Sequence, residues 1–141
     1  MKIQFQKLFP DITLPTYTHS TDAGMDLRTR ETKTLIPGER CILPTGFAMA
    51  IPEGYVGLVW DRSGLAIKEG LTCLAGVVDA GYRGEVGVVV LNTSDKNIEI
   101  EKGDRVAQML IQPVEICDIE IVDQLSNSER GEGGFGASGK K

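Results

Sequence analysis

The sequence has no long apolar run, a single histidine and only three cysteines, and these shortages exclude several kinds of protein. No stretch approaches the ~18 apolar residues of a transmembrane helix, and the start MKIQFQKLFP lacks the apolar core of a signal peptide. Cys41, Cys73 and Cys117 are odd in number and far apart, which argues against a disulfide framework. With His19 alone there is no CxxC or HxE cluster for zinc. We therefore expect single buried thiols in a soluble protein of the cytoplasm, or of the host cell interior if the gene is viral, with no membrane contact.

Clustered positive charge is also lacking. The net charge is −5, which disfavours a broad nucleic-acid surface because polyanion binding relies on grouped Lys and Arg. A small anionic ligand is still allowed, since it needs only a few donors and a divalent cation. The 141 residues fit one domain that can bury a core without staples.

Strand patterns dominate the chain. Apolar residues alternate with polar ones at Ile3 and Phe5 and again at Ile119 and Ile121, and VGVVVL (86–91) predicts a central strand. Turn formers separate the strands at IPGE (36–39), LPTG (43–46), IPEG (51–54) and NTSDKN (92–97). This spacing is typical of an antiparallel sandwich or barrel, so we predict an all-β domain over residues 1–125.

One short helix and one loose segment interrupt this pattern. Ser63 can cap a helix through LAIKE that Gly70 ends. The segment SNSERGEGGFGASGKK (126–141) has one large apolar residue, Phe135, among Gly, Ser and charge. Such a segment cannot offset its ordering entropy, so we expect a flexible tail when no ligand is bound.

The first motif with possible chemistry is AGMDL (23–27), which contains Asp26. A Gly and an Asp near the start of a strand are common in turns, and this is its plain interpretation. The alternative is a carboxylate that faces a hydrated Mg²⁺, an ion that prefers oxygen ligands and keeps several waters.

The second motif is Arg62-Ser63-Gly64-Leu65-Ala66. An arginine and a hydroxyl lie where a helix begins, and the free N–H groups there can bind phosphate. The alternative is a helix cap beside a solvated arginine.

The third motif is GVVDAGYRGE (76–85), in which two apolar strands flank a tight turn and predict a β-hairpin. A hairpin alone explains Asp79 and Gly81. Free main-chain groups at its mouth can also read the edge of a base, while Tyr82 packs beneath a sugar and Asp79 orients a water.

The fourth motif is GDRVAQ (103–108). It reads most simply as a turn into a strand, with Asp104 and Arg105 paired to each other or to neighbours. Gln108 would then lie on the polar face of that strand and could contact phosphate or water.

The fifth motif is RGEGGFGASG (130–139). Glycine-rich loops let main-chain N–H groups approach phosphates closely. A disordered tail is the alternative, but one Arg, one Phe and one Ser set in glycine also suit a lid.

These five segments, in this order over residues 23–139, resemble the five motifs of the trimeric dUTPase family, most specifically at GVVDAGYRGE and RGEGGFGASG. The resemblance implies a jelly-roll-like (β-clip) homotrimer with three active sites at subunit interfaces, which hydrolyses dUTP to dUMP and pyrophosphate. One subunit would supply the hairpin that binds deoxyuridine, a second the phosphate contacts and a third the tail as a lid. Such an enzyme keeps uracil out of DNA and supplies dUMP for dTMP synthesis.

The same resemblance implies residue roles. Asp79 corresponds to the base that activates water, Asp26 to the carboxylate that holds Mg²⁺ through water, and Phe135 to the ring over uracil. Tyr82 would pack on deoxyribose and exclude a 2′-hydroxyl. The substrate-binding residues implied in all are Arg62, Ser63, Gly64, Gly76, Val78, Tyr82, Gln108, Arg130, Phe135, Gly136 and Ser138.

Three positions depart from the family pattern. Cys73 stands where some members carry an Asn that contacts the base, and Gly81 stands where many have a second Asp. Asp61 replaces a common Pro and puts a negative charge near the phosphate site, either paired with Arg62 or facing solvent.

Two alternatives remain at this point. A dCTP deaminase, or a bifunctional deaminase and diphosphatase, shares the fold, but those chains tend to be longer and their termini differ from a GGFG lid. A non-catalytic β-domain that binds a partner would show a broken motif, and none of the five is visibly broken.

Overall fold

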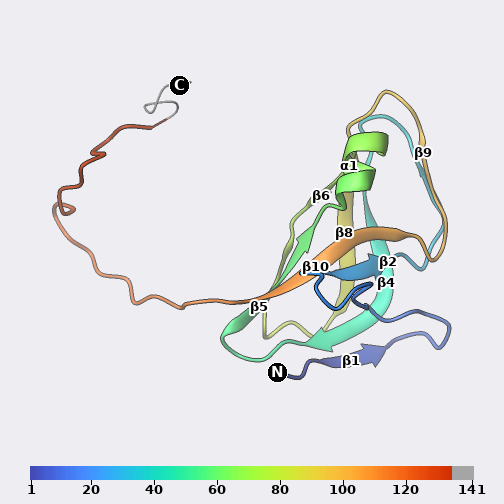
Figure 1. Cartoon of the computed structure of the whole chain (residues 1–141), viewed down its shortest axis with the longest axis horizontal. Coiled ribbons are helices and arrows are strands. Elements are labelled where there is room, and N and C mark those ends of the chain that lie inside the picture. The colour runs from blue at the N-terminus through green and yellow to red at the C-terminus, as the bar shows by residue number, and fades with distance from the viewer. Residues whose placement is uncertain (135–141) are drawn as a thin grey trace.

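The computed structural model describes residues 1–134 and has two four-stranded antiparallel sheets, a two-stranded ribbon and one short helix (Figure 1). This confirms the predicted all-β, jelly-roll-like fold. In chain order the elements are β1 (Gln4–Lys7), β2 (Met25–Arg28), β3 (Lys33–Leu35), β4 (Arg40–Ala50), β5 (Tyr55–Trp60), α1 (Ser63–Glu69), β6 (Leu71–Leu74), β7 (Val77–Val78), β8 (Glu85–Asn92), β9 (Ile98–Ile100) and β10 (Arg105–Pro113).

The chain alternates between the two sheets. One has the order β1-β4-β8-β6, the other β2-β10-β5-β7, and β3 pairs with β9. The predicted central strand is confirmed, because β8 lies between β4 and β6 and buries Val86, Val88 and Val90 while the residues between them are partly exposed. Phe47 and Met109 from the two sheets belong to the same core.

Three of the four predicted turns are present. At 36–39 the N–H of Glu39 donates to the carbonyl of Ile36, at 52–55 that of Tyr55 donates to Pro52, and bends occupy 94–96. The turn predicted at LPTG (43–46) is wrong, because β4 runs through it from Arg40 to Ala50. Its Pro and Gly fall instead at an irregularity in the β4–β8 pairing between Pro44 and Ala48, where Gly46 has a φ of 79°.

Helix α1 starts and ends close to the predicted residues. Gly70 ends it in the left-handed conformation, with a φ of 74°. The predicted cap is wrong, because Arg62 is the N-cap residue and Ser63 is the first helical residue, with no side-chain cap bond. Within residues 1–134 no helix is long and apolar enough to cross a bilayer.

Regular structure ends at Pro113, and residues 114–134 leave the sheets as an extended segment (Figure 1). The strand predicted around Ile119 and Ile121 is wrong, since these side chains are 93% and 95% exposed and no strand of the described residues pairs with them. Cys117 is exposed here too, and Cys41 and Cys73 are only partly buried, so the expectation of buried thiols is wrong. The boundary at residue 125 stays a prediction.

Candidate active site

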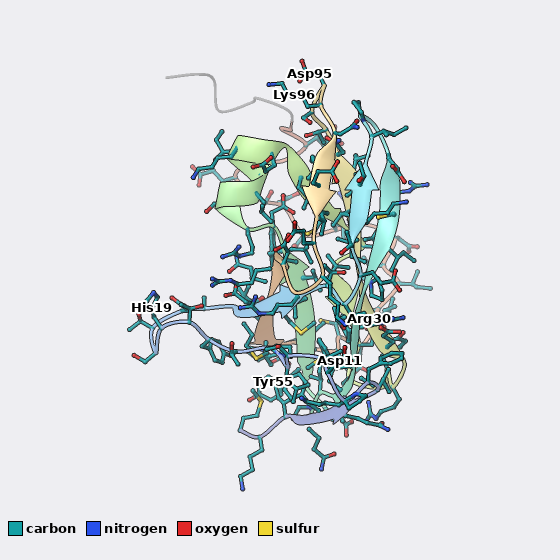
Figure 2. All side chains as sticks on the ribbon, turned by 90° about the vertical axis from the view of Figure 1, so that its right-hand side faces the viewer. Asp11, His19, Arg30, Tyr55, Asp95 and Lys96 are labelled. Atoms are coloured by element: carbon teal, nitrogen blue, oxygen red, sulfur yellow. The ribbon has the colours of Figure 1, made fainter. Side chains whose placement is uncertain are left out.

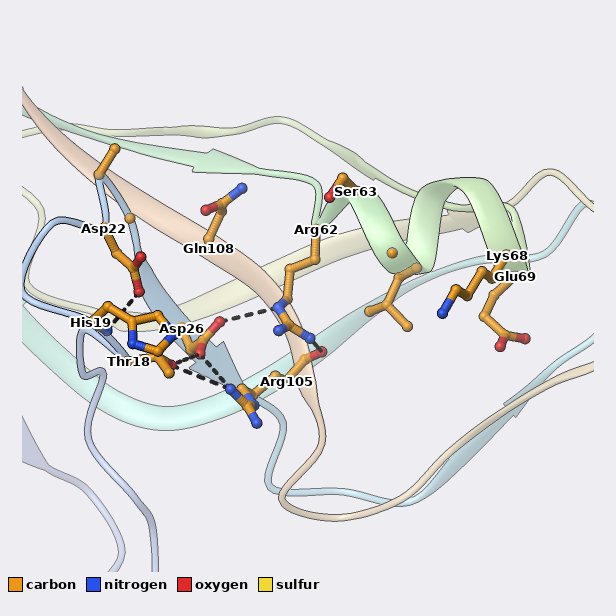
Figure 3. Close-up of a pocket in the computed structure, with 14 residues that line it drawn as sticks. Thr18, His19, Asp22, Asp26, Arg62, Ser63, Lys68, Glu69, Arg105 and Gln108 are labelled. Atoms are coloured by element: carbon orange, nitrogen blue, oxygen red, sulfur yellow. Dashed lines mark hydrogen bonds and ion pairs between the residues drawn. The ribbon is translucent and has the colours of Figure 1, made fainter.

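A pocket of about 610 Å³ opens between the loop before β2, the start of α1 and β10 (Figure 3). Three of the predicted motifs meet in it because β10 pairs with both β2 and β5, and α1 begins shortly after β5 ends. The predicted residues that line the pocket are Asp26, Arg62, Ser63, Gly64 and Gln108. We call it the phosphate pocket.

Asp26 is the centre of the polar contacts in this pocket. Its Oδ1 lies 3.1 Å from Nε of Arg62, and its Oδ2 lies 3.0 Å from a guanidinium nitrogen of Arg105. The hydroxyl of Thr18 donates to Oδ2 at 2.9 Å. These contacts bind β2, β10 and the start of α1 together at one carboxylate (Figure 3).

Sequence reasoning missed two of these partners, Thr18 and Arg105. Along a regular strand Arg105 and Gln108 would face opposite sides, since side chains alternate. The β10–β2 pairing has a bulge between Arg105 and Ala107, which turns both Arg105 and Gln108 into the phosphate pocket. The sequence shows an Arg three residues before a Gln. It does not show the bulge that brings the two side chains to the same face.

The ion pairs at Asp26 predict an acid-dependent stability. Burial by itself raises the pKa of Asp26, but hydrogen bonds from Arg105 and Thr18 and the charge of Arg62 outweigh burial, so the pKa lies below its ordinary value of 3.8. This stabilisation is therefore complete above about pH 5 and is lost as the pH falls below 3.8 through the folded-state pKa. At pH 7 the free energy of unfolding of Asp26→Asn should be about 1–3 kcal/mol lower than that of the wild type, because the two arginines lose an ionised partner. Near pH 2 the two free energies should converge.

Urea unfolding followed at a series of pH values checks this expectation. Asp95→Asn is the matched control, because Asp95 is exposed in a turn, lies far from His19 (Figure 2) and does not line the pocket. A constant difference between Asp26→Asn and the wild type from pH 7 to pH 2 would contradict the role given to the ionised carboxylate.

The start of α1 offers main-chain donors to the phosphate pocket. The first helical N–H groups have no carbonyl one turn earlier to bind, and the bonds from Leu65 and Ala66 to the carbonyl of Arg62 begin the helix. A Cβ added at Gly64 would meet nothing within 4 Å, so the chain's own packing does not require glycine there. The space left open is available to a ligand.

Gln108 is held from two sides. Its Nε2 donates to the main-chain carbonyl of Asp61 at 2.9 Å. A Cβ on Gly24 would lie 2.7 Å from its Oε1, so Gly24 is needed for Gln108 to occupy this position. The amide oxygen of Gln108 is thus placed to accept a hydrogen bond within the pocket, which suits water better than phosphate.

The third motif does not form the predicted hairpin. β7 pairs with β5 in one sheet and β8 pairs with β4 and β6 in the other, so the segment between them crosses from sheet to sheet. The tight turn is present, with the N–H of Tyr82 donating to the carbonyl of Asp79 at 3.1 Å. The hairpin is wrong because short apolar runs on both sides of a turn do not specify that they pair with each other.

The residues of this motif lie outside the phosphate pocket. Asp79 is exposed, and Tyr82 is 46% exposed with its hydroxyl donating to the carbonyl of Glu85 at 2.9 Å. Val78 pairs with Gly57 across to β5. A Cβ on Gly76 would lie 2.5 Å from the carbonyl oxygen of Val59, so this position requires glycine.

The predicted lid residues lie apart from both the phosphate pocket and the third motif. Arg130 lies in the exposed segment after β10, and its Nε donates to the carbonyl of Gly133 at 2.7 Å. Phe135, Gly136 and Ser138 lie outside the described residues. The described chain therefore brings together the predicted phosphate contacts, but not the nucleoside-binding residues or the lid.

A magnesium ion fits Asp26 only through water. In residues 1–134 no three His, Cys, Asp or Glu side chains gather to form a metal cage. An ionised carboxylate has about four acceptor positions, and the contacts of Arg62, Arg105 and Thr18 use three of them. One position remains at Oδ1, which suits a hydrogen bond from a metal-bound water, because Mg²⁺ keeps several waters and takes further oxygens from substrate phosphates.

Comparison with known proteins shows which family the chain belongs to. The sequence model of the dUTPase family matches residues 10–139. The chain belongs to the dUTPase family. The deoxyuridine 5′-triphosphate nucleotidohydrolase of Clostridium tetani is 45% identical over 140 residues, covering 98% of this chain and 97% of its own. That of Leifsonia xyli subsp. xyli is 52% identical over 130 residues, covering 89% and 85%. The family and the enzyme class expected from the sequence, dUTP diphosphatase, are thereby confirmed.

Solved dUTPases share the fold. The dUTPase of Staphylococcus bacteriophage 80alpha with dUPNHPP has a TM-score of 0.92 and 36% identity, covering 98% of both chains. A mutant dUTPase of phage phi11 of S. aureus has a TM-score of 0.84 and 29% identity, covering 90% of this chain and all of its own, and is described with a structural Mg(II) ion.

Proposed function

We propose that this chain hydrolyses dUTP to dUMP and pyrophosphate, which keeps uracil out of DNA and supplies dUMP for dTMP synthesis. The observation that carries the proposal is the phosphate pocket, where Asp26, Arg62 and Gln108 meet in a member of the dUTPase family. The similar 80alpha dUTPase holds dUPNHPP, and the curated relatives are named for this substrate. The site of action is the cytoplasm, or the host cell interior if the gene is viral.

Arg62, Ser63 and Gly64 contact the phosphate groups in this proposal. The guanidinium of Arg62 has five N–H donors, of which Nε pairs with Asp26 and one further nitrogen donates to the carbonyl of Arg105 at 3.3 Å. Donors remain for a phosphate oxygen, and the hydroxyl of Ser63 and the amide of Gly64 lie beside them. Phosphoryl transfer depends mainly on such positioning and on positive charge near the transferring group.

The charges of the pocket call for an added cation. With His19 counted as neutral, the positive charges among its lining residues, Arg62, Lys68 and Arg105, are matched by three negative ones, Asp22, Asp26 and Glu69. A triphosphate therefore meets no net positive charge from these side chains. Mg²⁺ bound to the phosphates would supply that charge, and Asp26 would hold its water shell at Oδ1 while Gln108 accepts from water.

The deoxyuridine is read by β7 and the turn after it. β7 is the edge strand of its sheet, so one side of Val77–Val78 has main-chain groups with which no strand in the described part of the chain pairs. The carbonyl of Gly76 already accepts from the N–H of Val59 at 2.7 Å, which fixes the start of β7. Main-chain groups of Gly76 and Val78 would match uracil, and cytosine would leave buried groups mismatched at roughly 1–3 kcal/mol each. Tyr82 packs on the deoxyribose and excludes a 2′-hydroxyl.

Asp79 is the general base of the proposed reaction. Its exposed carboxylate accepts a proton from a water molecule, whose oxygen bonds to the α-phosphorus as the bond to the pyrophosphate oxygen breaks on the opposite side. The products are dUMP and pyrophosphate. Asp79 does not line the phosphate pocket of its own chain, so the base and the phosphate contacts must be brought together from different copies.

A homotrimer with shared active sites meets this requirement. The exposed segment after β10 carries Ile116, Ile119, Ile121 and Leu125, each more than 80% exposed. Leaving these side chains in water forgoes a large hydrophobic stabilisation, which a surface of a second copy would supply. The same segment leads to Arg130, Phe135, Gly136 and Ser138, which would close over the uracil and the distal phosphates of a neighbouring subunit.

A panel of nucleoside triphosphates tests the proposed function. With Mg²⁺ present we expect pyrophosphate from dUTP, and at least 100-fold less from dCTP, dTTP and UTP, because each leaves a mismatched polar group or a steric clash. Chelation of the metal with EDTA should reduce turnover of dUTP at least tenfold. Ammonia release from dCTP would identify a deaminase instead, and intact dUTP in the presence of Mg²⁺ would refute the proposal.

A further inference from the structure

We propose that Asp61 is a positioning residue, which fixes the start of α1, and with it the phosphate contacts, against β6 and β10. The proposal deepens the proposed function and rests on it for the link to catalysis. Asp61 lies between the end of β5 at Trp60 and the helix cap at Arg62. The sequence alone left open whether its carboxylate pairs with Arg62 or faces solvent.

The contacts of Asp61 give a third answer. Its Oδ1 accepts the main-chain N–H of Cys73, and its Oδ2 accepts the hydroxyl of Thr72 at 2.9 Å. Its main-chain carbonyl accepts Nε2 of Gln108 at 2.9 Å. Asp61 therefore contacts β6 of one sheet through its carboxylate and β10 of the other sheet through its backbone.

The strand that Asp61 contacts needs such a partner. β6 is the edge strand of its sheet and, within residues 1–134, pairs with β8 alone. In an edge strand every second main-chain N–H points away from the sheet. The carboxylate of Asp61 satisfies the outward N–H of Cys73 with a charge-assisted hydrogen bond, which is stronger than a bond to a neutral acceptor.

These bonds close a loop that contains the whole of α1. The helix spans only Ser63–Glu69 and has no fully buried residue; Leu65 packs partly buried against the core, so the short helix is held by limited burial. Asp61 at its start is tied to Thr72 and Cys73 just beyond its end. We call this link the Asp61 clamp.

The clamp sets the geometry of the phosphate pocket. Arg62, Ser63 and Gly64 follow Asp61 directly, and Gln108 is bound by the carbonyl of the same residue. Displacement of a substrate-positioning group by about 1 Å can cost on the order of 100-fold in rate. A residue that touches no substrate thus controls the relative placement of four proposed phosphate or water contacts.

Cys73 offers a chemical probe of the clamp. Burial, together with the hydrogen bond and negative charge of Asp61, raises the pKa of the Cys73 thiol to about 12. Removal of the carboxylate should lower this pKa, because two of its causes disappear. Faster alkylation of Cys73 by iodoacetamide at pH 9, resolved from Cys41 and Cys117 by peptide mass spectrometry, would report the loss.

The main test combines hydrogen exchange with kinetics on the full chain. In Asp61→Ala we expect the amides of residues 62–69 to exchange at least tenfold faster while those of β8 keep the wild-type rate. We expect kcat for dUTP to fall about tenfold with KM changed less than threefold. Asp61→Asn should keep most of the slow exchange and most of the wild-type kcat, because its amide oxygen can accept from Cys73 and its NH₂ group can donate to Thr72.

Thr72→Val provides the second arm, since it removes one clamp bond and keeps the shape of the side chain. It should give a smaller change of the same kind, and no further change when combined with Asp61→Ala. Asp95→Ala, which removes an exposed carboxylate from the turn after β8 and no bond of the Asp61 clamp, should match the wild type. If Asp61→Ala does not fold, the exchange rates and kcat of Thr72→Val and Asp61→Asn are compared with those of the wild type instead.

The outcomes separate the clamp from the proposed function. Wild-type exchange of residues 62–69 in Asp61→Ala or Thr72→Val would overturn the clamp. Faster exchange with an unchanged kcat would overturn its part in hydrolysis. A wild-type chain without dUTP hydrolysis would refute the proposed function, while the exchange rates would still decide whether the clamp exists.

Discussion

Asp79→Asn is expected to bind the analogue dUPNHPP as the wild type does and to hydrolyse dUTP about 10²–10⁴-fold more slowly. Asparagine has nearly the shape of aspartate but cannot accept the proton of the attacking water. The carboxylate is exposed and its main-chain carbonyl keeps the turn to Tyr82, so folding should be unaffected. Pyrophosphate release and calorimetric binding of the analogue measure the two halves of this expectation.

The control for this variant is Asp95→Asn, which makes the same chemical change in an exposed turn after β8. Its kcat should equal that of the wild type. Normal turnover by Asp79→Asn would show that another group takes the proton, and the assignment of the base would then be wrong. A loss of analogue binding would point to a role in substrate recognition instead.

Truncation after Gln124 is expected to leave a folded trimer and to reduce turnover about 10²–10³-fold. The core of the two sheets ends at β10, so its packing does not need the removed residues. The truncation removes Arg130 and Phe135, which in the proposed trimer close over the phosphates and the base of a neighbouring subunit. Sedimentation and steady-state kinetics on the same sample measure assembly and activity.

A shorter truncation after Gly139 is the matched control, because it removes only Lys140 and Lys141 and leaves the glycine-rich motif intact. It should keep full activity. Unchanged kinetics after truncation at Gln124 would refute the lid, and a fully active monomer of the intact chain would refute the shared active site.

The residues of the phosphate pocket were predictable because each lies beside a turn or a helix start whose chemistry is local. A glycine before Asp26 and a Ser-Gly pair after Arg62 signal these positions without knowledge of the fold. The partners of Asp26 were not predictable, because Arg105 reaches it only through a bulge in β10 and Thr18 through a loop. The contacts of Asp61 with Thr72 and Cys73 were also not predictable, because α1 separates these residues from Asp61 in the sequence.

Strand pairing was the weakest part of the prediction. Alternation at Ile119 and Ile121 shows that the segment suits a sheet, but a strand forms only where a partner strand lies beside it. The same limit explains the hairpin predicted around Asp79, because the apolar residues of Val77–Val78 fit β5 as well as β8. The side chains alone do not choose between two sheets that share one core.

The exposed apolar segment after β10 also affects how easily the newly made chain aggregates. In the unassembled chain the side chains of Ile116, Ile119, Ile121 and Leu125 stay in water, where exposed apolar groups promote association between chains. Glu115, Asp118, Glu120 and Asp123 are interspersed among them, and such charges oppose the stacking of identical segments into aggregates. These four acidic residues therefore limit aggregation of the chain before it assembles into the proposed trimer.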